Sequence, residues 1–409
     1  MENYKRVKSA CYMTNISMAV VVNISPILFL TFRDLYKISY SLLGLLVLIN
    51  FCTQLTIDLI FSFFSHKFNI GKTVKITPIL TLTGLLIYSL WPVLFKETAY
   101  LGLAVGTVIF SASGGLCEVL ISPVVAAIPS DEPDREMSKL HSIYARGVVG
   151  VVIFATIFLT IFGEENWYIL TLLLMAIPVF ASILFSKAEI PKMDTPEKVS
   201  GALKMLKNKT LLMAVLAIFL GGAAECTMAQ WCSGYIEKVT GIPKLYGDIF
   251  GVALFSVMLG LGRSLYGKIG KNIEKVLLLG AIGSALCYLV SAISPFPALS
   301  LITCAFTGFC ASMLWPGNLI AASDRIPDGG VFLYAMMASG GDLGASVVPQ
   351  IVGIVTDKVM ENGAMINLAS KLGMEAEQLG MRCGMLIGMV FPLIAIPIFV
   401  KFIKEKKKI

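Results

Sequence analysis

Long apolar segments dominate the chain. Runs of about 20 apolar residues recur from one end to the other, and short polar stretches separate them. In lipid the backbone polar groups must be bonded within each segment, which an α-helix achieves. The pattern predicts an all-α membrane protein with twelve transmembrane helices, at about 9–32, 41–64, 73–95, 98–128, 138–162, 166–186, 210–236, 246–267, 275–294, 298–323, 330–356 and 378–402.

The longest polar stretch divides the chain into equal halves. Residues 187–209 carry six Lys side chains and separate six predicted spans from six. We therefore expect an N-terminal six-helix bundle at 1–186, a cytoplasmic linker at 187–209 and a C-terminal six-helix bundle at 210–409. Both halves have a glycine-and-basic turn after the second span, at 62–72 and 260–268. Such weak repetition is typical of transporters built from two bundles related by pseudo-twofold symmetry.

The basic residues predict the orientation. If the N-terminus lies inside, 25 of the 33 Lys and Arg residues fall on the inner side. This bias follows the positive-inside rule and predicts a multi-pass protein of the inner (plasma) membrane with both termini in the cytoplasm. The net charge of +7 is then explained by topology, and no nucleic-acid partner is implied.

Composition excludes several classes of function. Only 14% of residues are charged, against about 25% in soluble proteins. Two His residues and nine irregularly spaced Cys residues give little material for a zinc or haem site, so we expect no metal and no cofactor. The chain has no nucleotide-binding loop and no nucleophile with a partnered base, so neither a primary pump nor an enzyme is expected. We expect a monomer.

Glu118 is the most conspicuous charge in the sequence. It lies in the middle of an otherwise uncharged run, 98–130, that is long enough to cross a bilayer. A carboxylate there must be paired, hydrated or protonated, because an ion in hydrocarbon costs at least ~2.5–3.5 kcal/mol. Two interpretations fit: Glu118 couples protons or binds substrate, or it is a structural partner of Arg146 on the next span.

The two glycine-and-basic turns, the charged linker and the twelve spans together resemble the major facilitator superfamily. In its loop signature an aspartate usually precedes the basic residue, whereas this chain has His66 before Lys67. The resemblance implies gating roles for His66, Lys67 and, in the second turn, Arg263. Asp58, near the inner end of its span, is a further candidate for a gate or a helix-cap contact.

Within that superfamily, three stretches are similar to the fucose–proton symporter family. The first is GGLCEVLISP at 114–123, with Ser122 where the family has asparagine. The second is GAAE at 222–225, followed by Trp231 and Tyr235. The third comprises the segments SMLWPGNLIAASDRIPDGG and MASGGDLGASVVPQIVGIVTD of the tenth and eleventh spans.

The resemblance implies that Glu118 is a proton-coupling acid, and we consider Glu225 and Asp342 as further coupling groups. A first-span aspartate of the family is missing, because alignment on Pro26 places Val22 there, with Asn23 beside it. Asp342 can equally be bonded to neighbouring Ser or backbone groups within its glycine-rich span.

Other polar residues are candidates for substrate binding. Glu225 opens a polar patch in which Gln230 and Trp231 share one helical face with Thr227 and Tyr235. Polar groups beside a ring would suit the hydroxyls and the C–H face of a pyranose. Alternatively, Trp231 belongs to an aromatic belt. Arg146 can bind an anionic group or extend to the inner membrane surface. The uncharged candidates are Asn23, Tyr144 and Asn318, although bonds between helices explain the asparagines equally well.

The sequence thus predicts a secondary active transporter that imports a sugar or related polyol with protons by alternating access. Its expected partners are a small-molecule substrate, protons and the lipid bilayer. Two alternatives remain: proton-driven efflux of lipophilic cations, and a transporter-like sensor that binds ligand without moving it.

Overall fold

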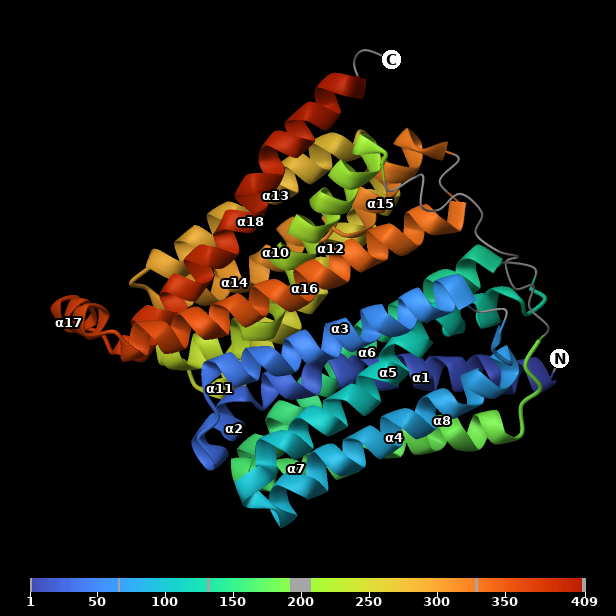
Figure 1. The fold of residues 1–409 in the computed structure, drawn as a ribbon, viewed down its shortest axis with the longest axis horizontal. Coiled ribbons are helices and arrows are strands. Elements are labelled where there is room, and N and C mark those ends of the chain that lie inside the picture. Colours follow the sequence, from blue (N-terminus) through green and yellow to red (C-terminus); the bar gives the residue numbers. More distant parts are fainter. Residues whose placement is uncertain (1, 65–66, 131–132, 192–206, 328–329, 407–409) are drawn as a thin grey trace. The chain divides into compact units, whose positions relative to one another are not determined.

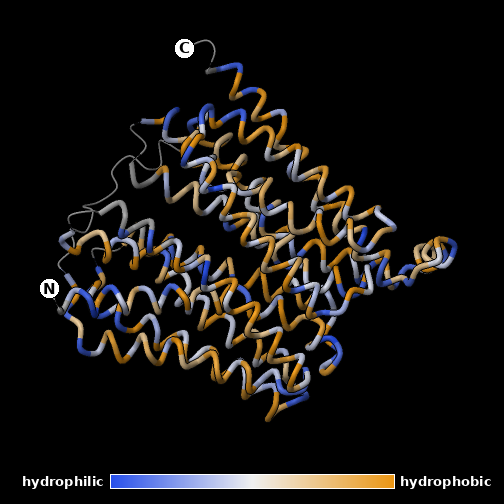
Figure 2. Tube along the Cα trace, turned by 180° about the vertical axis from the view of Figure 1, so that it is seen from behind, coloured by the Kyte–Doolittle hydropathy of each residue, from blue (hydrophilic) through white to orange (hydrophobic). Residues whose placement is uncertain are grey.

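The computed structural model describes residues 2–64, 67–130, 133–191, 207–327 and 330–406, and every regular element within these ranges is helical. The described residues contain 12 helical segments long and apolar enough to cross a membrane. Figure 2 shows hydrophobic positions along the helices and hydrophilic positions concentrated towards their ends. The predicted all-α membrane architecture with twelve spans is therefore confirmed.

The chain divides into two compact units. Unit 1 comprises Met1–Tyr36 and Ile49–Ser200, and unit 2 comprises Lys37–Leu48 and Gly201–Ile409. The later division falls inside the stretch 187–209 that was expected to be a linker. From the sequence, the segment Lys37–Leu48 was expected in the N-terminal bundle, whereas in the structure it clusters with the second half of the chain.

Unit 1 is built from long helices and a few short ones (Figure 1). Its elements are α1 (Glu2–Ile27), α2 (Phe29–Tyr36), most of α3 (Tyr40–Phe64), α4 (Ile70–Leu94), η2 (Lys96–Thr98), α5 (Ala99–Ala126), α6 (Pro133–Phe162), η3 (Glu164–Asn166), α7 (Trp167–Leu174) and α8 (Ala176–Ser186). Buried side chains of α1, α5 and α8, among them Val7, Leu120 and Phe185, form one apolar core. This core leaves the polar face of α3 to a separate network, described below.

Unit 2 has the same kind of construction (Figure 1). Its elements are α10 (Lys209–Thr240), α11 (Lys244–Gly247), η4 (Asp248–Ala253), α12 (Leu254–Ile269), α13 (Ile273–Ile293), α14 (Pro297–Ala311), α15 (Pro316–Arg325), α16 (Gly330–Glu361), α17 (Gly363–Lys371) and α18 (Ala376–Lys406). Its apolar core joins α10, α13, α15 and α18 through side chains such as Leu220, Leu277 and Phe399.

The tenth span is interrupted. The sequence predicts one helix at 298–323, whereas the structure ends α14 at Ala311 and begins α15 at Pro316. Proline has no N–H to donate and favours the first position of a helix, which explains why a new helix starts there. The four residues between the helices leave backbone carbonyl groups available to other partners.

An aspartate attaches the start of α3 to unit 2. The Asp357 carboxylate, on α16, accepts hydrogen bonds from Tyr40 N at 3.0 Å and from Ser41 N at 2.6 Å. The Tyr40 hydroxyl donates to Glu377 Oε1 on α18 at 2.7 Å. A carboxylate at a helix N-terminus satisfies unpaired N–H groups and is favoured by the helix dipole. These bonds explain why Lys37–Leu48 clusters with unit 2.

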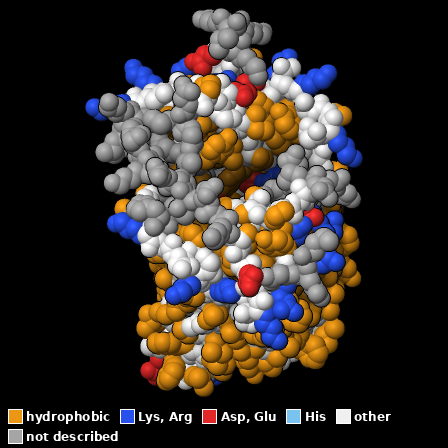
Figure 3. Space-filling view, turned by 90° about the vertical axis from the view of Figure 1, so that its right-hand side faces the viewer, with side chains coloured by type: hydrophobic (Ala, Val, Ile, Leu, Met, Phe, Trp, Pro, Cys, Tyr) orange, Lys and Arg blue, Asp and Glu red, His pale blue; other side chains and the backbone are white. Residues whose placement is uncertain are grey.

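Basic side chains gather at helix ends and loops. Figure 3 shows groups of Lys and Arg side chains between areas of hydrophobic side chains on the face it draws. Polar ends that flank apolar helices are what a membrane-spanning protein requires.

Candidate functional site

A row of polar side chains runs along α3 in unit 1. Asn50, Gln54 and Asp58 are spaced four residues apart and therefore share one helical face. Gln54 Nε2 donates to Asn50 Oδ1 at 2.8 Å, and the Ser111 hydroxyl, on α5, donates to the same oxygen at 2.6 Å. All four side chains are buried. We call these four residues together with Glu118 the polar seam.

Two glycines bring α5 against α3. A Cβ atom placed on Gly115 would lie 2.8 Å from the Gln54 carbonyl oxygen and 2.9 Å from the Ile57 Cβ. A Cβ atom on Gly114 would lie 3.1 Å from the Gln54 side chain. Only residues without a side chain allow the backbones to approach so closely. Glu118 follows these glycines by one turn of α5, as Asp58 follows Gln54 by one turn of α3.

The end of the polar seam at Asp58 holds two acids. Asp58 is 6% exposed, and its Oδ1 makes no hydrogen bond within the described part of the chain. It interacts electrostatically with Glu118, whose side chain is exposed although it lies inside an apolar span. Among the described residues no ion pair joins either acid to a base. Two carboxyl groups so placed can share a proton, which removes the repulsion between them.

Arg146 does not pair with Glu118. It is exposed and lines an apolar groove of about 530 Å³ together with Ile16 of α1 and Ile177 of α8. Over the residues that the structure describes, neither a hydrogen bond nor an ion pair to Glu118 is formed. The structural alternative for Glu118 therefore lacks its partner in this conformation.

Unit 2 holds its acid differently. Glu225, on α10, forms an ion pair with Arg263, on α12, whose Nη2 lies 3.0 Å from Oε1 and 3.3 Å from Oε2. Arg263 Nε donates to the Ser312 carbonyl oxygen at 3.0 Å, at the break between α14 and α15. One guanidinium thus binds both the acid and a carbonyl group released by the broken helix.

The same break places an aromatic ring beside glycines. Trp315 is half-buried, and a Cβ atom on Gly341 of α16 would lie 2.6 Å from its ring. A Cβ atom on Gly222 of α10 would lie 3.1 Å from the same ring. Asp342, next to Gly341, interacts electrostatically with Cys226, the neighbour of Glu225. The predicted coupling residues Glu225 and Asp342 therefore belong to one region of unit 2.

The aromatic residues expected to contact a sugar are buried. Trp231 is 2% exposed, and its Nε1 donates to the Pro349 carbonyl oxygen at 2.9 Å. The Tyr235 hydroxyl donates to the Ser291 carbonyl oxygen at 2.7 Å. Gln230 is also buried, at 3% exposure. In this conformation these side chains hold helices of unit 2 together, and contact with a substrate stays a prediction.

The uncharged candidates show similar local bonds. Asn318 is buried and its Nδ2 donates to the Leu314 carbonyl oxygen at 2.6 Å. Asn23 is half-buried and donates to the Ala19 carbonyl oxygen at 2.8 Å. Tyr144 is half-buried on α6. Their roles in binding stay predictions.

The residues predicted to gate lie in different environments. Asp58 belongs to the polar seam, and His66 lies outside the described residues. Lys67 is exposed, with Nζ 5.1 Å from the centre of the Phe64 ring. Arg263 is not in a turn, as residues 260–268 were expected to be, because α12 continues to Ile269. The helix keeps Arg263 inside its span, where it reaches Glu225.

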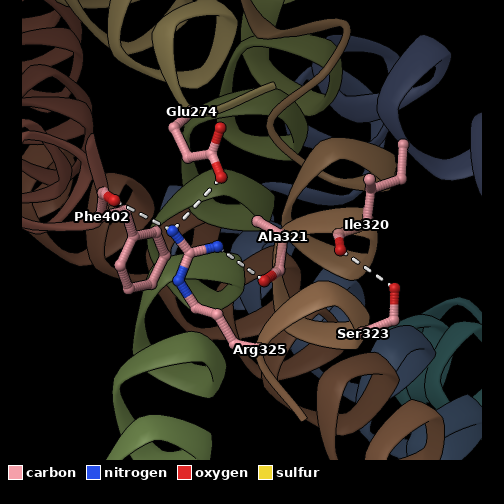
Figure 4. Close-up of polar contacts among 6 residues, drawn as sticks. All are labelled: Glu274, Ile320, Ala321, Ser323, Arg325 and Phe402. Atoms are coloured by element: carbon pink, nitrogen blue, oxygen red, sulfur yellow. Dashed lines mark hydrogen bonds and ion pairs between the residues drawn. The ribbon is translucent and has the colours of Figure 1, made fainter. Parts of the chain in front are cut away.

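A second arginine pair lies in unit 2 (Figure 4). Arg325, at the end of α15, binds Glu274 Oε1 at 3.3 Å and the carbonyl oxygens of Ala321 at 2.8 Å and Phe402 at 3.1 Å. Its guanidinium also lies over the Phe402 ring, 4.2 Å from the centroid. Both charged side chains are nearly buried, so Arg325 connects α13, α15 and α18 in a dry environment.

Sequence reasoning missed two features of these sites. The seam was not recognised as a unit, although polar residues at every fourth position of a predicted helix were a visible signal. The bond from Arg263 to Ser312 was not foreseeable, because it depends on a carbonyl group that only the helix break exposes.

Twelve helices long enough to cross a membrane within the described residues, with charged groups inside them, are typical of a multi-pass membrane protein. A sequence model described as the Major Facilitator Superfamily matches residues 10–359. The chain therefore belongs to the Major Facilitator Superfamily. No curated protein matches the sequence.

Solved structures share the fold. A D-xylose–proton symporter has a TM-score of 0.73 at 13% identity, with 95% of this chain and 97% of that chain covered. A bacterial homologue of the human lysosomal transporter Spinster, inward-facing and occupied, has a TM-score of 0.72 at 13% identity, covering 99% and 97%. A variant of the E. coli fucose:proton symporter FucP has a TM-score of 0.55 at 16% identity, covering 95% and 98%. Such low identities establish likeness of fold alone.

Proposed function

We propose that this protein is a proton-coupled importer of a sugar or related polyol, close to the fucose–proton symporters. The observation that carries the proposal is the acid pair of the polar seam: Glu118 and Asp58 interact within apolar spans and have no base beside them among the described residues. The sequence motif around Glu118 supports the family assignment, and the proton-symporter names among the structural neighbours are compatible with it.

The proton's role follows from charge. Two neighbouring carboxylates repel each other, and a proton on one of them removes that repulsion as well as the cost of one ion in the membrane. A proton held by Asp58 and Glu118 would therefore lower the barrier to the change between inward-facing and outward-facing states. Asp58 then shares the task that the family assigns to a first-span acid, which this chain lacks.

A direct test uses purified protein in liposomes that contain a pH-sensitive dye. Addition of fucose, galactose, glucose or xylose to the outside is expected to acidify the interior for at least one sugar. The Glu118→Gln variant is expected to lose that acidification. Sugar uptake without any proton movement in the wild-type protein would refute coupling, and undiminished acidification in Glu118→Gln would remove Glu118 as the coupling group.

One observation favours efflux of lipophilic cations as a second candidate function. Acids without a neighbouring base attract any cation, and a lipophilic cation would be stabilised by Glu118 as a proton is. Proton-driven accumulation of tetraphenylphosphonium inside inside-out vesicles, with no sugar-dependent proton movement, would favour this function over sugar import.

We also propose that both termini face the cytoplasm of a plasma membrane and that the protein works as a monomer. The excess of Lys and Arg on one side of the predicted spans supports the orientation. Reporter fusions at each terminus, one active only in the cytoplasm and one only outside, test it. Activity of the external reporter at either end would contradict the proposed topology.

A further inference from the structure

The pair Glu225–Arg263 has the geometry of a substrate site that is filled by a side chain of the protein itself. We infer that Arg263 is the binding residue for an oxyanion on the substrate, a carboxylate or a phosphate, and that Glu225 occupies its place when the substrate is absent. This inference rests on the proposed transport function and narrows its substrate from sugars and polyols in general to their anionic derivatives.

Arg263 is held in place, but only some of its N–H donors form hydrogen bonds within the described part of the chain. Its Nε is committed to the Ser312 carbonyl oxygen, and its Nη2 is shared between the two oxygens of Glu225. Arginine carries five N–H donors. Within the described part of the chain, the two donors of Nη1 have no hydrogen-bond partner. A second oxyanion can therefore bind at Nη1 and Nη2 without breaking the bond to Ser312.

The guanidinium is also accessible. Its side chain is 41% exposed, whereas the Glu225 side chain is 12% exposed. Arg263 lies six residues before the end of α12, about 9 Å inside the helix terminus. An arginine in a membrane span is costly unless it is paired or hydrated, and Glu225 supplies the pair here. The exposed part of the guanidinium is open to a further ligand.

The two arginine pairs of unit 2 differ in this respect. Arg325 is 13% exposed and its partner Glu274 is 3% exposed, and the guanidinium binds two carbonyl oxygens and lies over the Phe402 ring. That arrangement leaves little room for a ligand. Arg263 has an accessible edge, and the neighbouring helix break provides the irregular backbone that transporters place at their binding sites.

The charge of the site is conserved when a monoanion replaces Glu225 only if Glu225 takes a proton from the solution. The pair Glu225–Arg263 is neutral, and a monoanion on Arg263 forms a neutral pair in turn. A displaced Glu225 that stays ionised adds one negative charge and must be hydrated. A neutral sugar offers no group that competes with Glu225 for the guanidinium, because its hydroxyls bind an arginine less strongly than a carboxylate does.

The test compares the binding of neutral compounds and of their anionic derivatives to the full-length protein. Thermal unfolding and isothermal titration are measured with three sets: glucose, glucuronate and glucose 6-phosphate; galactose and galacturonate; glycerol, glycerate and glycerol 3-phosphate. At least one anion is expected to bind about 10- to 100-fold more tightly than its neutral counterpart. Carboxylates and phosphates in the same set separate the two kinds of oxyanion.

Three variants give the specific readout. Arg263→Gln is expected to remove the preference for the anion, and Arg263→Lys to reduce it, since lysine lacks the planar fork. Glu225→Gln removes the competing carboxylate and is expected to tighten anion binding by about tenfold. Lys401→Gln, which removes one exposed positive charge, is the control and should leave all affinities unchanged. If Arg263→Gln does not fold, the anion affinity of Glu225→Gln relative to wild type tests the inference.

The inference is overturned if the neutral compound binds at least as tightly in every set, if no anion binds to either wild type or Glu225→Gln, or if Glu225→Gln leaves anion affinity unchanged. Proton-coupled uptake of a neutral sugar would then leave the proposed transport function intact. Conversely, anion binding through Arg263 without uptake into liposomes would support the site and refute the transport function.

Discussion

The acids of the polar seam and the arginine-paired acids of unit 2 have opposite surroundings. In unit 1, Asp58 and Glu118 lie together at the end of the polar seam without a base among the described residues. In unit 2, Glu225 and Glu274 are each held by an arginine, at 3.0 Å and 3.3 Å. A neighbouring arginine favours the charged form of an acid, whereas a second neighbouring acid disfavours it. We therefore expect proton exchange at the acid pair of unit 1 and fixed charge at the pair Arg325–Glu274 of unit 2.

The largest effect is expected from breaking the drier arginine pair. Arg325→Gln leaves Glu274 nearly buried without its base, and removal of one member of such a pair costs about 3–5 kcal/mol. We expect a correspondingly large fall in the melting temperature of the purified protein in detergent. Lys401→Gln breaks an exposed pair and should change stability by less than about 0.5 kcal/mol. Equal effects of the two variants would contradict the assignment of fixed, buried charge to unit 2.

The next largest effect on stability is expected where α3 and α5 approach each other closely. In Gly115→Ala the new methyl group meets the Gln54 carbonyl oxygen and the Ile57 Cβ, so the helices must separate. We expect a loss of about 1–3 kcal/mol in unfolding free energy, as for other overpacked sites. Proton-coupled uptake should fall as well, because the change separates Asp58 from Glu118.

Gly150→Ala is the matched control. It also places alanine in a membrane helix, but a Cβ atom at Gly150 meets nothing within 4 Å. This variant should keep full stability and uptake. Equal stability and equal uptake in Gly115→Ala and Gly150→Ala would show that function does not depend on the close contact between α3 and α5.

Neutralising an acid of the polar seam should raise the unfolding free energy, unlike the substitutions above. Asp58→Asn removes a buried group that repels Glu118 and that has an oxygen without a hydrogen bond. We expect the unfolding free energy to rise by up to about 1 kcal/mol. Glu274→Gln, in contrast, should lower it, because Arg325 loses its partner. A fall in melting temperature for both variants would show that Asp58 is stabilised by its surroundings as a charged group.

The smallest effect concerns an acid outside the spans. Glu136 on α6 binds Lys8 on α1 at 3.1 Å and accepts a hydrogen bond from the Tyr12 hydroxyl. The bond to Lys8 lowers the pKa of Glu136 from its ordinary value of 4.5. The resulting stabilisation, about 0.2–1 kcal/mol, is complete above that value and is lost as the pH falls through the lowered pKa. Melting curves of wild type and Glu136→Gln should differ slightly at neutral pH and converge as the pH falls below the lowered pKa of Glu136. A difference that persisted at low pH would exclude this cause.

Much of the fold could be predicted from hydropathy. Twelve apolar segments and their order follow from the requirement that lipid-exposed backbone be helical, and the structure places twelve candidate spans at similar positions. The break at residues 312–315 was not predicted, because the span as a whole is apolar enough to cross a membrane and hydropathy does not detect a missing backbone bond. The attachment of Lys37–Leu48 to unit 2 depends on Asp357, more than 300 residues away along the chain.

The sites were only partly predictable. Glu118, Asp58, Glu225 and Asp342 were identified because charge in an apolar segment is visible in the sequence. Which of them are paired was not visible, since pairing depends on how helices are rotated about their axes. Thus Arg146, expected beside Glu118 in one interpretation, lies in an apolar groove, and Arg263, expected in a turn, holds Glu225.

The central claim is that the acid pair of the polar seam carries the proton. The most direct test compares two modes of transport in liposomes for the double variant Asp58→Asn, Glu118→Gln. Counterflow, in which labelled substrate exchanges for unlabelled substrate, needs no net proton movement and should continue at a rate near that of the wild type. Accumulation driven by a proton gradient should be abolished. Accumulation at the wild-type level in the double variant would contradict the claim.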